Sequence, residues 1–147
     1  MTSRPGSTPP TVLIFGLLGI IPFWSVPATT LLEPAWVGIS VAVEAVYAAL
    51  ILSFLGGARW GLAVREPSPN PMVVGLAMTP TLAGLAILTF THGLARPQLL
   101  ALAAALTLCW VWDGRAKDLP PWYRRFRSLL TLGAVSGLCV SVMLVPQ

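Results

Sequence analysis

Five long apolar runs, separated by short polar segments, most constrain how this chain can fold. Their approximate bounds are residues 11–28, 34–57, 72–91, 98–112 and 128–145. A helix of about 20 apolar residues is long enough to cross the roughly 30 Å hydrocarbon core of a bilayer. A chain in lipid must satisfy its own backbone hydrogen bonds, and the runs lack the alternation of barrel strands, so each run is predicted to be a helix.

The composition supports a membrane location. Only 10% of the 147 residues are charged and 56% are hydrophobic, whereas a soluble domain of this size carries roughly 25% charged residues. The sequence therefore predicts an all-α membrane protein, a five-helix transmembrane bundle formed by residues 11–147. Residues 1–10, rich in Ser, Thr and Pro, are predicted to be a disordered arm.

The basic residues predict the orientation of the bundle. Eight fall in the arm, the second-to-third connection and the fourth-to-fifth connection, which lie on one side, and Arg96 alone falls on the other. The eight are Arg4, Arg59, Arg65, Arg115, Lys117, Arg124, Arg125 and Arg127. The positive-inside rule then places the N-terminus in the cytoplasm, or the matrix of an organelle, and the C-terminus outside. Since these charges lie where lipid headgroups would be, no nucleic-acid partner is expected despite the net charge of +4.

Glu44 is the strongest candidate for a functional side chain, because it falls near the middle of the second run. A charge at that depth costs about 2.5–3.5 kcal/mol, so the neutral acid is the expected form. We expect it to bond to Thr81 or Ser136, at similar depth, or to the carbonyl of Leu76, which Pro80 deprives of its helical donor. Two interpretations stay open, a proton- or ligand-binding carboxyl and a polar clamp between helices.

The second run ends at a pair of glycines followed by charged and aromatic residues. Gly56 and Gly57 are predicted to allow a neighbouring helix to approach closely. Arg59 and Trp60 are typical of residues that anchor a helix end at the headgroups. Arg59 also has the chemistry to bind a lipid phosphate or an acidic group of a partner, and both interpretations stay open.

An aromatic and basic segment precedes the fifth run. It holds Trp122, Tyr123, Arg124, Arg125 and Arg127. Aromatic rings seat at the membrane interface, and each arginine near it attracts anionic headgroups by about 1 kcal/mol. The segment is therefore predicted either to bind anionic lipid or a partner, or only to set the topology.

Gly133 and Gly137 form a GxxxG pattern within the fifth run. Small residues at this spacing let two helices approach closely in a membrane. We predict a packing role, which the pattern allows either within this bundle or between copies of the chain.

No motif of a familiar catalytic or cofactor site is present in the sequence. The one histidine, His92, cannot supply paired axial ligands for a haem, and there is no Walker loop, HExxH or nucleophile elbow. Among the five acidic residues only Glu44 falls clearly at depth, so a metal cage is not expected. The prediction is a non-enzymatic protein without cofactor or metal.

Two motifs resemble those of the transmembrane protein 69 family. They are ILSFLGGARWG, Ile51 to Gly61, and LPPWYRRFRSLLT, Leu119 to Thr131. The family consists of small multi-span proteins of unknown function from proteobacteria and mitochondria. The resemblance implies a multi-span architecture in a bacterial inner membrane, or in a mitochondrial inner membrane in a eukaryote, and it transfers no mechanism.

Three functions are compatible with these features. The first is an accessory or assembly subunit of a larger energy-transducing membrane complex, respiratory or photosynthetic, with other membrane subunits as partners. The second is a small transporter or proton pathway that uses Glu44, although no inverted repeat is evident. The third is a structural protein that binds anionic membrane lipids through Arg59 and residues 124–127.

Overall fold

The computed structural model describes residues 8–114 and 121–145, and within those ranges its regular elements are all helices. Five helical spans are long and apolar enough to cross a membrane, which confirms the predicted all-α class with five spans. They are Pro10–Leu32, Pro34–Ala63, Pro71–Phe90, Ala95–Gly114 and Trp122–Leu144. Most of the predicted arm, residues 1–7, lies outside the described residues, as do Arg115 and Lys117.

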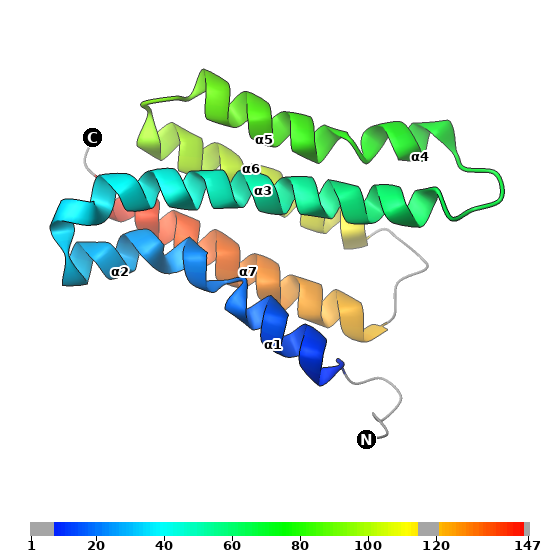
Figure 1. Cartoon of the computed structure of the whole chain (residues 1–147), viewed down its shortest axis with the longest axis horizontal. Coiled ribbons are helices and arrows are strands. Elements are labelled where there is room, and N and C mark those ends of the chain that lie inside the picture. Colours follow the sequence, from blue (N-terminus) through cyan, green and yellow to red (C-terminus); the bar gives the residue numbers. More distant parts are fainter. Residues whose placement is uncertain (1–7, 115–120, 146–147) are drawn as a thin grey trace.

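The first span is broken into three pieces. These are α1 (Pro10–Leu18), the 3₁₀-helix η1 (Ile21–Trp24) and α2 (Ser25–Leu32). Pro22 has no backbone N–H for an α-helical ladder, and this explains why the chain tightens into η1 here. The break lets the first span change direction half-way through the bundle (Figure 1).

The second span is the longest helix of the bundle. After the short η2 (Pro34–Trp36), α3 runs without interruption over Val37–Ala63, and so passes the glycine pair. At 1.5 Å per residue its 27 residues extend about 40 Å, more than a hydrocarbon core requires. Its last turns therefore bring Arg59 and Trp60 to the membrane boundary.

The third span divides into α4 (Pro71–Leu76) and α5 (Thr79–Phe90). Pro80 cannot donate to the carbonyl of Leu76, and the Thr79 hydroxyl donates to that carbonyl instead, at 2.7 Å. The expectation that Glu44 uses the freed carbonyl is therefore wrong, because a neighbouring threonine satisfies it locally.

The last two spans are α6 (Ala95–Gly114) and α7 (Pro121–Leu144). The last helix begins about two turns before Ser128, where the apolar run begins, so Trp122 to Arg127 are helical rather than part of a loop. Pro121 suits this start, because the first helical position has no use for its N–H. The basic segment consequently presents its arginines on defined faces of a helix.

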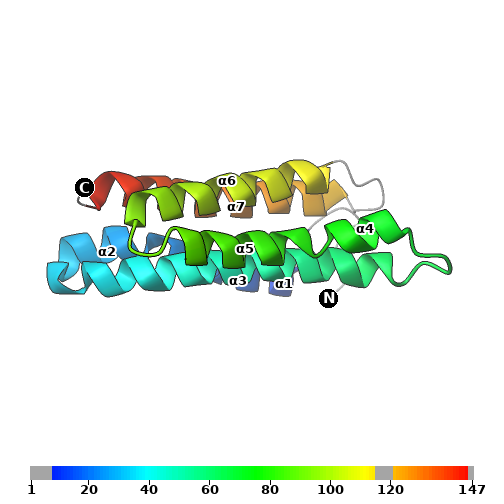
Figure 2. The same cartoon turned by 90° about the horizontal axis from the view of Figure 1, so that it is seen from above.

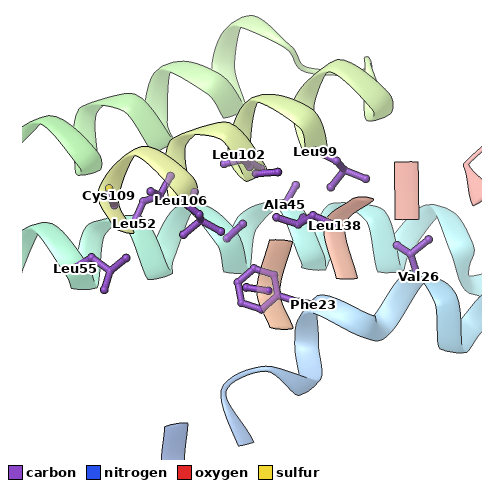
Figure 3. Close-up of a cluster of buried hydrophobic side chains, with 14 of the residues drawn as sticks. Phe23, Val26, Ala45, Leu52, Leu55, Leu99, Leu102, Leu106, Cys109 and Leu138 are labelled. Atoms are coloured by element: carbon purple, nitrogen blue, oxygen red, sulfur yellow. The ribbon is translucent and has the colours of Figure 1, made fainter. Parts of the chain in front are cut away.

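The helices pack in two layers. Seen from above, α6 and α7 form one layer, and α3 lies in the other between α2 and α5 (Figure 2). The buried core lies where the layers meet, and its side chains come from α3, α6, α7, η1 and α2 (Figure 3). Leu52, Leu99, Leu102 and Leu138 are fully enclosed there. Since lipid is as apolar as leucine, close packing rather than escape from water stabilises this core.

The described basic residues segregate along the bundle. The start of α1, the end of α3, the end of α6 and the start of α7 gather at one end of the molecule (Figure 1). We call this the basic end, and its described cations are Arg59, Arg65, Arg124, Arg125 and Arg127. At the opposite end Arg96 donates from Nε to the carbonyl of Val145 at 2.9 Å.

Candidate functional site

Three charged side chains meet at the basic end and join three spans. Asp113, near the end of α6, lies between Arg59 of α3 and Arg127 of α7. Its Oδ1 is 3.0 Å from Arg59 Nε, and its Oδ2 accepts a hydrogen bond from Arg127 Nε at 2.9 Å. We call these three residues the ion cluster.

Arg59 makes two further contacts with α6. Its Nη2 donates to the carbonyl oxygen of Trp112 at 2.9 Å, and its guanidinium carbon lies 4.4 Å from the centre of the Trp112 ring. Such a cation–π contact is worth about 0.5–2 kcal/mol, depending on desolvation. Arg59 is therefore held within the bundle, and it is not a free anchor in the headgroups.

The charges in the ion cluster do not balance. Two guanidiniums face one carboxylate, which leaves one positive charge in excess. Arg127 and Asp113 are only 7% and 8% exposed, so solvent screens this excess poorly. Arg127 Nη2 is buried without a hydrogen-bond partner among the described residues. The cluster is therefore suited to attract an additional anionic group.

Glu44 lies deeper, seven residues after the start of α3, and is fully buried. Its two carboxyl oxygens are each 2.9 Å from Ser141 Oγ on α7. The same serine oxygen is 3.0 Å from the carbonyl oxygen of Gly137. We call Glu44 and Ser141 the acid–serine pair. It joins α3 to α7.

The single hydroxyl proton of Ser141 cannot serve both Glu44 and the Gly137 carbonyl. A neutral carboxylic acid resolves the conflict, because its O–H donates to Ser141 and Ser141 donates to Gly137. In either form the carboxyl has hydrogen-bond partners within the chain. The arrangement can hold a proton at depth, and it links helices while doing so.

Neither expected side-chain partner of Glu44 is used. Thr81 donates to Ser53 Oγ at 3.2 Å and so joins α5 to α3. Ser136 donates to the carbonyl of Gly133 within its own helix, at 3.1 Å. Both predictions were wrong because similar depth in the membrane does not mean that two side chains point toward each other.

The four glycines singled out in the sequence differ in their surroundings. A Cβ on Gly56 would lie 2.5 Å from the carbonyl oxygen of Ala77, where the third span is broken, whereas a Cβ on Gly57 would meet nothing within 4 Å. A Cβ on Gly133 would lie 2.8 Å from Ile20, and one on Gly137 would come 2.2 Å from the carbonyl oxygen of Phe23. The GxxxG pattern therefore lies against the broken first span, inside this bundle.

The remaining residues of the basic segment lie around the ion cluster. Arg124 and Arg125 are exposed on the first turns of α7, and the Trp122 and Tyr123 rings meet edge to face with centres 5.9 Å apart. Trp60 is 43% exposed at the end of α3. These positions suit contact with headgroups or with a partner.

A crevice of about 560 Å³ opens between α1, η1, α3 and α7. Its walls are largely apolar, and Phe15, Ile51 and Phe54 belong to them. Arg127 and Thr131 line it as well, and Thr131 Oγ1, like Arg127 Nη2, is buried without a partner among the described residues. The crevice thus combines an apolar interior with buried hydrogen-bond donors.

Sequence reasoning missed Asp113, Ser141 and Tyr47. Tyr47 donates to the carbonyl of Gly19 at 2.9 Å and packs its ring against Phe23, which holds η1 against α3. The sequence did carry one usable signal for Asp113, since it is an acidic residue at the boundary where Arg59 and Arg127 also fall. Among the described residues no group of three His, Cys, Asp or Glu side chains is placed to hold a metal ion.

Comparisons with known proteins agree with this architecture. Transmembrane protein 69 of Xenopus tropicalis is 32% identical over 139 residues, which are 92% of this chain and 54% of that protein. Transmembrane protein 69 of Mus musculus is 28% identical over 141 residues, 93% of this chain and 57% of that protein. The chain thus spans about half the length of these relatives, and no solved structure matches it. Residues 8–144 match the family described as a protein of unknown function, DUF3429. The predicted resemblance is confirmed, and the chain belongs to this DUF3429 family.

Proposed function

We propose that this integral membrane protein is non-enzymatic and acts as an accessory or assembly subunit of a larger energy-transducing membrane complex. One observation supports this role above others: the buried acidic groups of the described bundle serve to join its own helices. Glu44 bonds to Ser141, and Asp113 pairs with Arg59 and Arg127. Rigid helices with an apolar outer surface are suited to pack against other subunits and lipids.

A proton pathway fits the same geometry less well. A relay carboxyl must exchange protons with water on both sides of the membrane, whereas Glu44 is fully enclosed. Its bond to Ser141 holds it within the bundle. Under our proposal, proteoliposomes that contain the unmodified protein and proteoliposomes that contain Glu44→Gln show the same proton flux.

The test of the proposal is isolation in a mild detergent. A tag on the N-terminal residues and extraction in digitonin, followed by native electrophoresis, should show the protein in a species far larger than its own 15.6 kDa. Mass spectrometry of that species should identify membrane subunits in fixed proportion. Migration as an isolated monomer, with no co-purified subunit, would contradict the proposal.

The location and orientation are part of the same proposal. We place the protein in a bacterial inner membrane, or in a mitochondrial inner membrane in a eukaryote, with the basic end in the cytoplasm or matrix. The charge asymmetry supports this, since Arg96 lies alone at the opposite end among the described cations. An alkaline phosphatase fused after Gln147 should be active in the periplasm of a bacterial host. Activity of a cytoplasmic reporter at the same position would show that the orientation is the opposite one.

A further inference from the structure

The crevice between the first span and the rest of the bundle follows the length of α3. On α3 its lining residues extend from Ala58, near the basic end, to Tyr47, which at 1.5 Å per residue corresponds to about 16 Å. On the first span they extend from Val12 to Phe23, over a similar length. The crevice is therefore an elongated apolar slot that leads from one membrane surface toward the middle of the bilayer.

Hydrogen-bond donors occupy the end of this slot that lies nearer the surface. Arg127 and Thr131 are one helical turn apart on α7, and Thr131 is the deeper of the two. Each is only 7% exposed, and each has a buried polar atom without a partner in the described part of the chain, Nη2 and Oγ1 respectively. A buried donor left unsatisfied costs about 1–3 kcal/mol, and more when it is charged. Both side chains line the slot, so a ligand whose acceptors meet these atoms after a small side-chain rotation would recover that energy.

The charge of the ion cluster determines which kind of hydrogen-bond acceptor a ligand of this slot should carry. Arg127 belongs to the ion cluster, in which two arginines share the single carboxylate of Asp113. The excess of one positive charge favours an anion beside Arg127, and a guanidinium matches the geometry of a phosphate. The slot thus has a cationic outer part and an apolar inner part, the same order as an anionic lipid from headgroup to tail.

We propose that the crevice is a binding site for one anionic phospholipid of the leaflet at the basic end. One acyl chain lies in the apolar slot along α3, and the phosphate accepts from Arg127. Thr131, one turn deeper, donates to an ester carbonyl, which in a phospholipid lies deeper than the phosphate. A hydrophobic helix of another protein could fill the slot, but its backbone carbonyls are already bonded and it would bring no anion to Arg127.

Native mass spectrometry of the whole chain in detergent tests this proposal. The delipidated protein is titrated with dioleoyl phosphatidylglycerol and, as the zwitterionic probe with the same chains, dioleoyl phosphatidylcholine. We expect one bound phosphatidylglycerol per chain at low lipid concentration. Loss of a charge-assisted hydrogen bond in Arg127→Gln should weaken its binding about tenfold or more, which removes the preference over phosphatidylcholine. Arg65→Gln removes an exposed charge at the same end and should leave binding unchanged.

Two further variants and one control variant separate binding from folding. Thr131→Val keeps the shape of the side chain and the contacts of Asp113, and loss of one neutral hydrogen bond should weaken both lipids about fivefold. Ala58→Phe fills the slot from an exposed position, and Ala104→Phe places the same ring on an exposed position of α6 outside the slot. The first should abolish the single tight site and the second should preserve it.

Three results would overturn the proposal. They are equal affinity for the two lipids in the unmodified protein, tight binding of phosphatidylglycerol to Ala58→Phe, and a protein segment that covers the slot in place of lipid. The last would appear as a cross-link from a photoreactive residue at position 58 to a second copy of the chain or to another subunit.

Discussion

The ion cluster and the acid–serine pair both connect α3 to α7, but they use different chemistry. At the basic end the link consists of two arginines and an aspartate, which bring in α6 as well. Deeper in the bundle, toward its opposite end, it consists of a carboxyl and a hydroxyl. No ion pair reaches Glu44 among the described residues, whereas Asp113 has two.

Depth in the membrane explains the difference. Transferring a charge to the centre of a bilayer costs several kcal/mol, and this cost falls toward the headgroups. Full charges can therefore be used at the basic end, where water and headgroups are near, while a link at depth is cheaper as a neutral hydrogen bond. We therefore expect the bundle to use ionic links near its surface and a neutral link in its interior.

The largest effect is expected from Asp113→Ala. It leaves Arg59 and Arg127 buried together without a counter-charge, and breaking a buried pair in this way costs about 3–5 kcal/mol. Thermal unfolding in detergent, followed by tryptophan fluorescence, measures the loss. Asp113→Asn keeps one hydrogen-bond acceptor and should lose less. If Asp113→Ala has the same melting temperature as the unmodified protein, the ion cluster is not a structural link.

Packing beside the acid–serine pair is the next most sensitive feature. In Gly137→Ala the new Cβ would lie 2.2 Å from the carbonyl oxygen of Phe23, so η1 must move, at a cost of about 1–3 kcal/mol. Gly57→Ala is the matched control, because its Cβ meets nothing within 4 Å and alanine favours the helix. Equal melting temperatures for the two variants would show that the middle of the bundle does not depend on this contact.

The two halves of the ion cluster should differ in strength. Arg127 Nε donates an aligned hydrogen bond to Asp113, whereas Arg59 Nε is close to the carboxylate without such alignment. Double-mutant cycles with Asp113 should give about 1.5–3 kcal/mol for Arg127 and under about 1 kcal/mol for Arg59. Arg59 keeps its bonds to Trp112 when Asp113 is removed. A larger coupling for Arg59 would reverse this ranking.

The smallest effect is expected from Glu44→Gln. Its amide can still bond to Ser141, and hydrogen bonds between membrane helices average about 0.6 kcal/mol, with about 1.7 as the largest measured. Ser141→Ala should cost a similar amount, and the two changes together should cost less than their sum, because both act on the same bond. A loss as large as that of Asp113→Ala would mean that Glu44 is ionised in the fold, and the contrast between the two regions would fail.

Much of the architecture could be predicted from the sequence. The apolar runs and the boundary prolines predict the number of spans, because insertion of a segment into a bilayer depends directly on its length and hydropathy, which are local properties. The start of α7 was predicted too late, at Ser128 instead of Pro121, since a polar amphipathic turn that continues a helix looks like a loop. The broken first span was signalled by Pro22, but its new direction was not.

The partners of the buried polar residues could not be predicted. Depth can be counted along a helix, but the direction of a side chain depends on how the helix is rotated about its axis. Ser136 and Ser141 are five residues apart, which at 100° per residue turns them roughly 140° from each other. Ser136 was expected to meet Glu44, and Ser141 does.

The sequence by itself determined that this chain is a five-span helical membrane protein with its cations concentrated at one end. Those features follow from local hydropathy and charge, and the family match over residues 8–144 agrees with them. Only the tertiary structure decided that Asp113 joins Arg59 and Arg127, that Ser141 meets Glu44, and that a slot opens beside Arg127. Each of these depends on the rotation and approach of helices that are distant in the chain, because helix contacts are made by particular faces that composition does not specify.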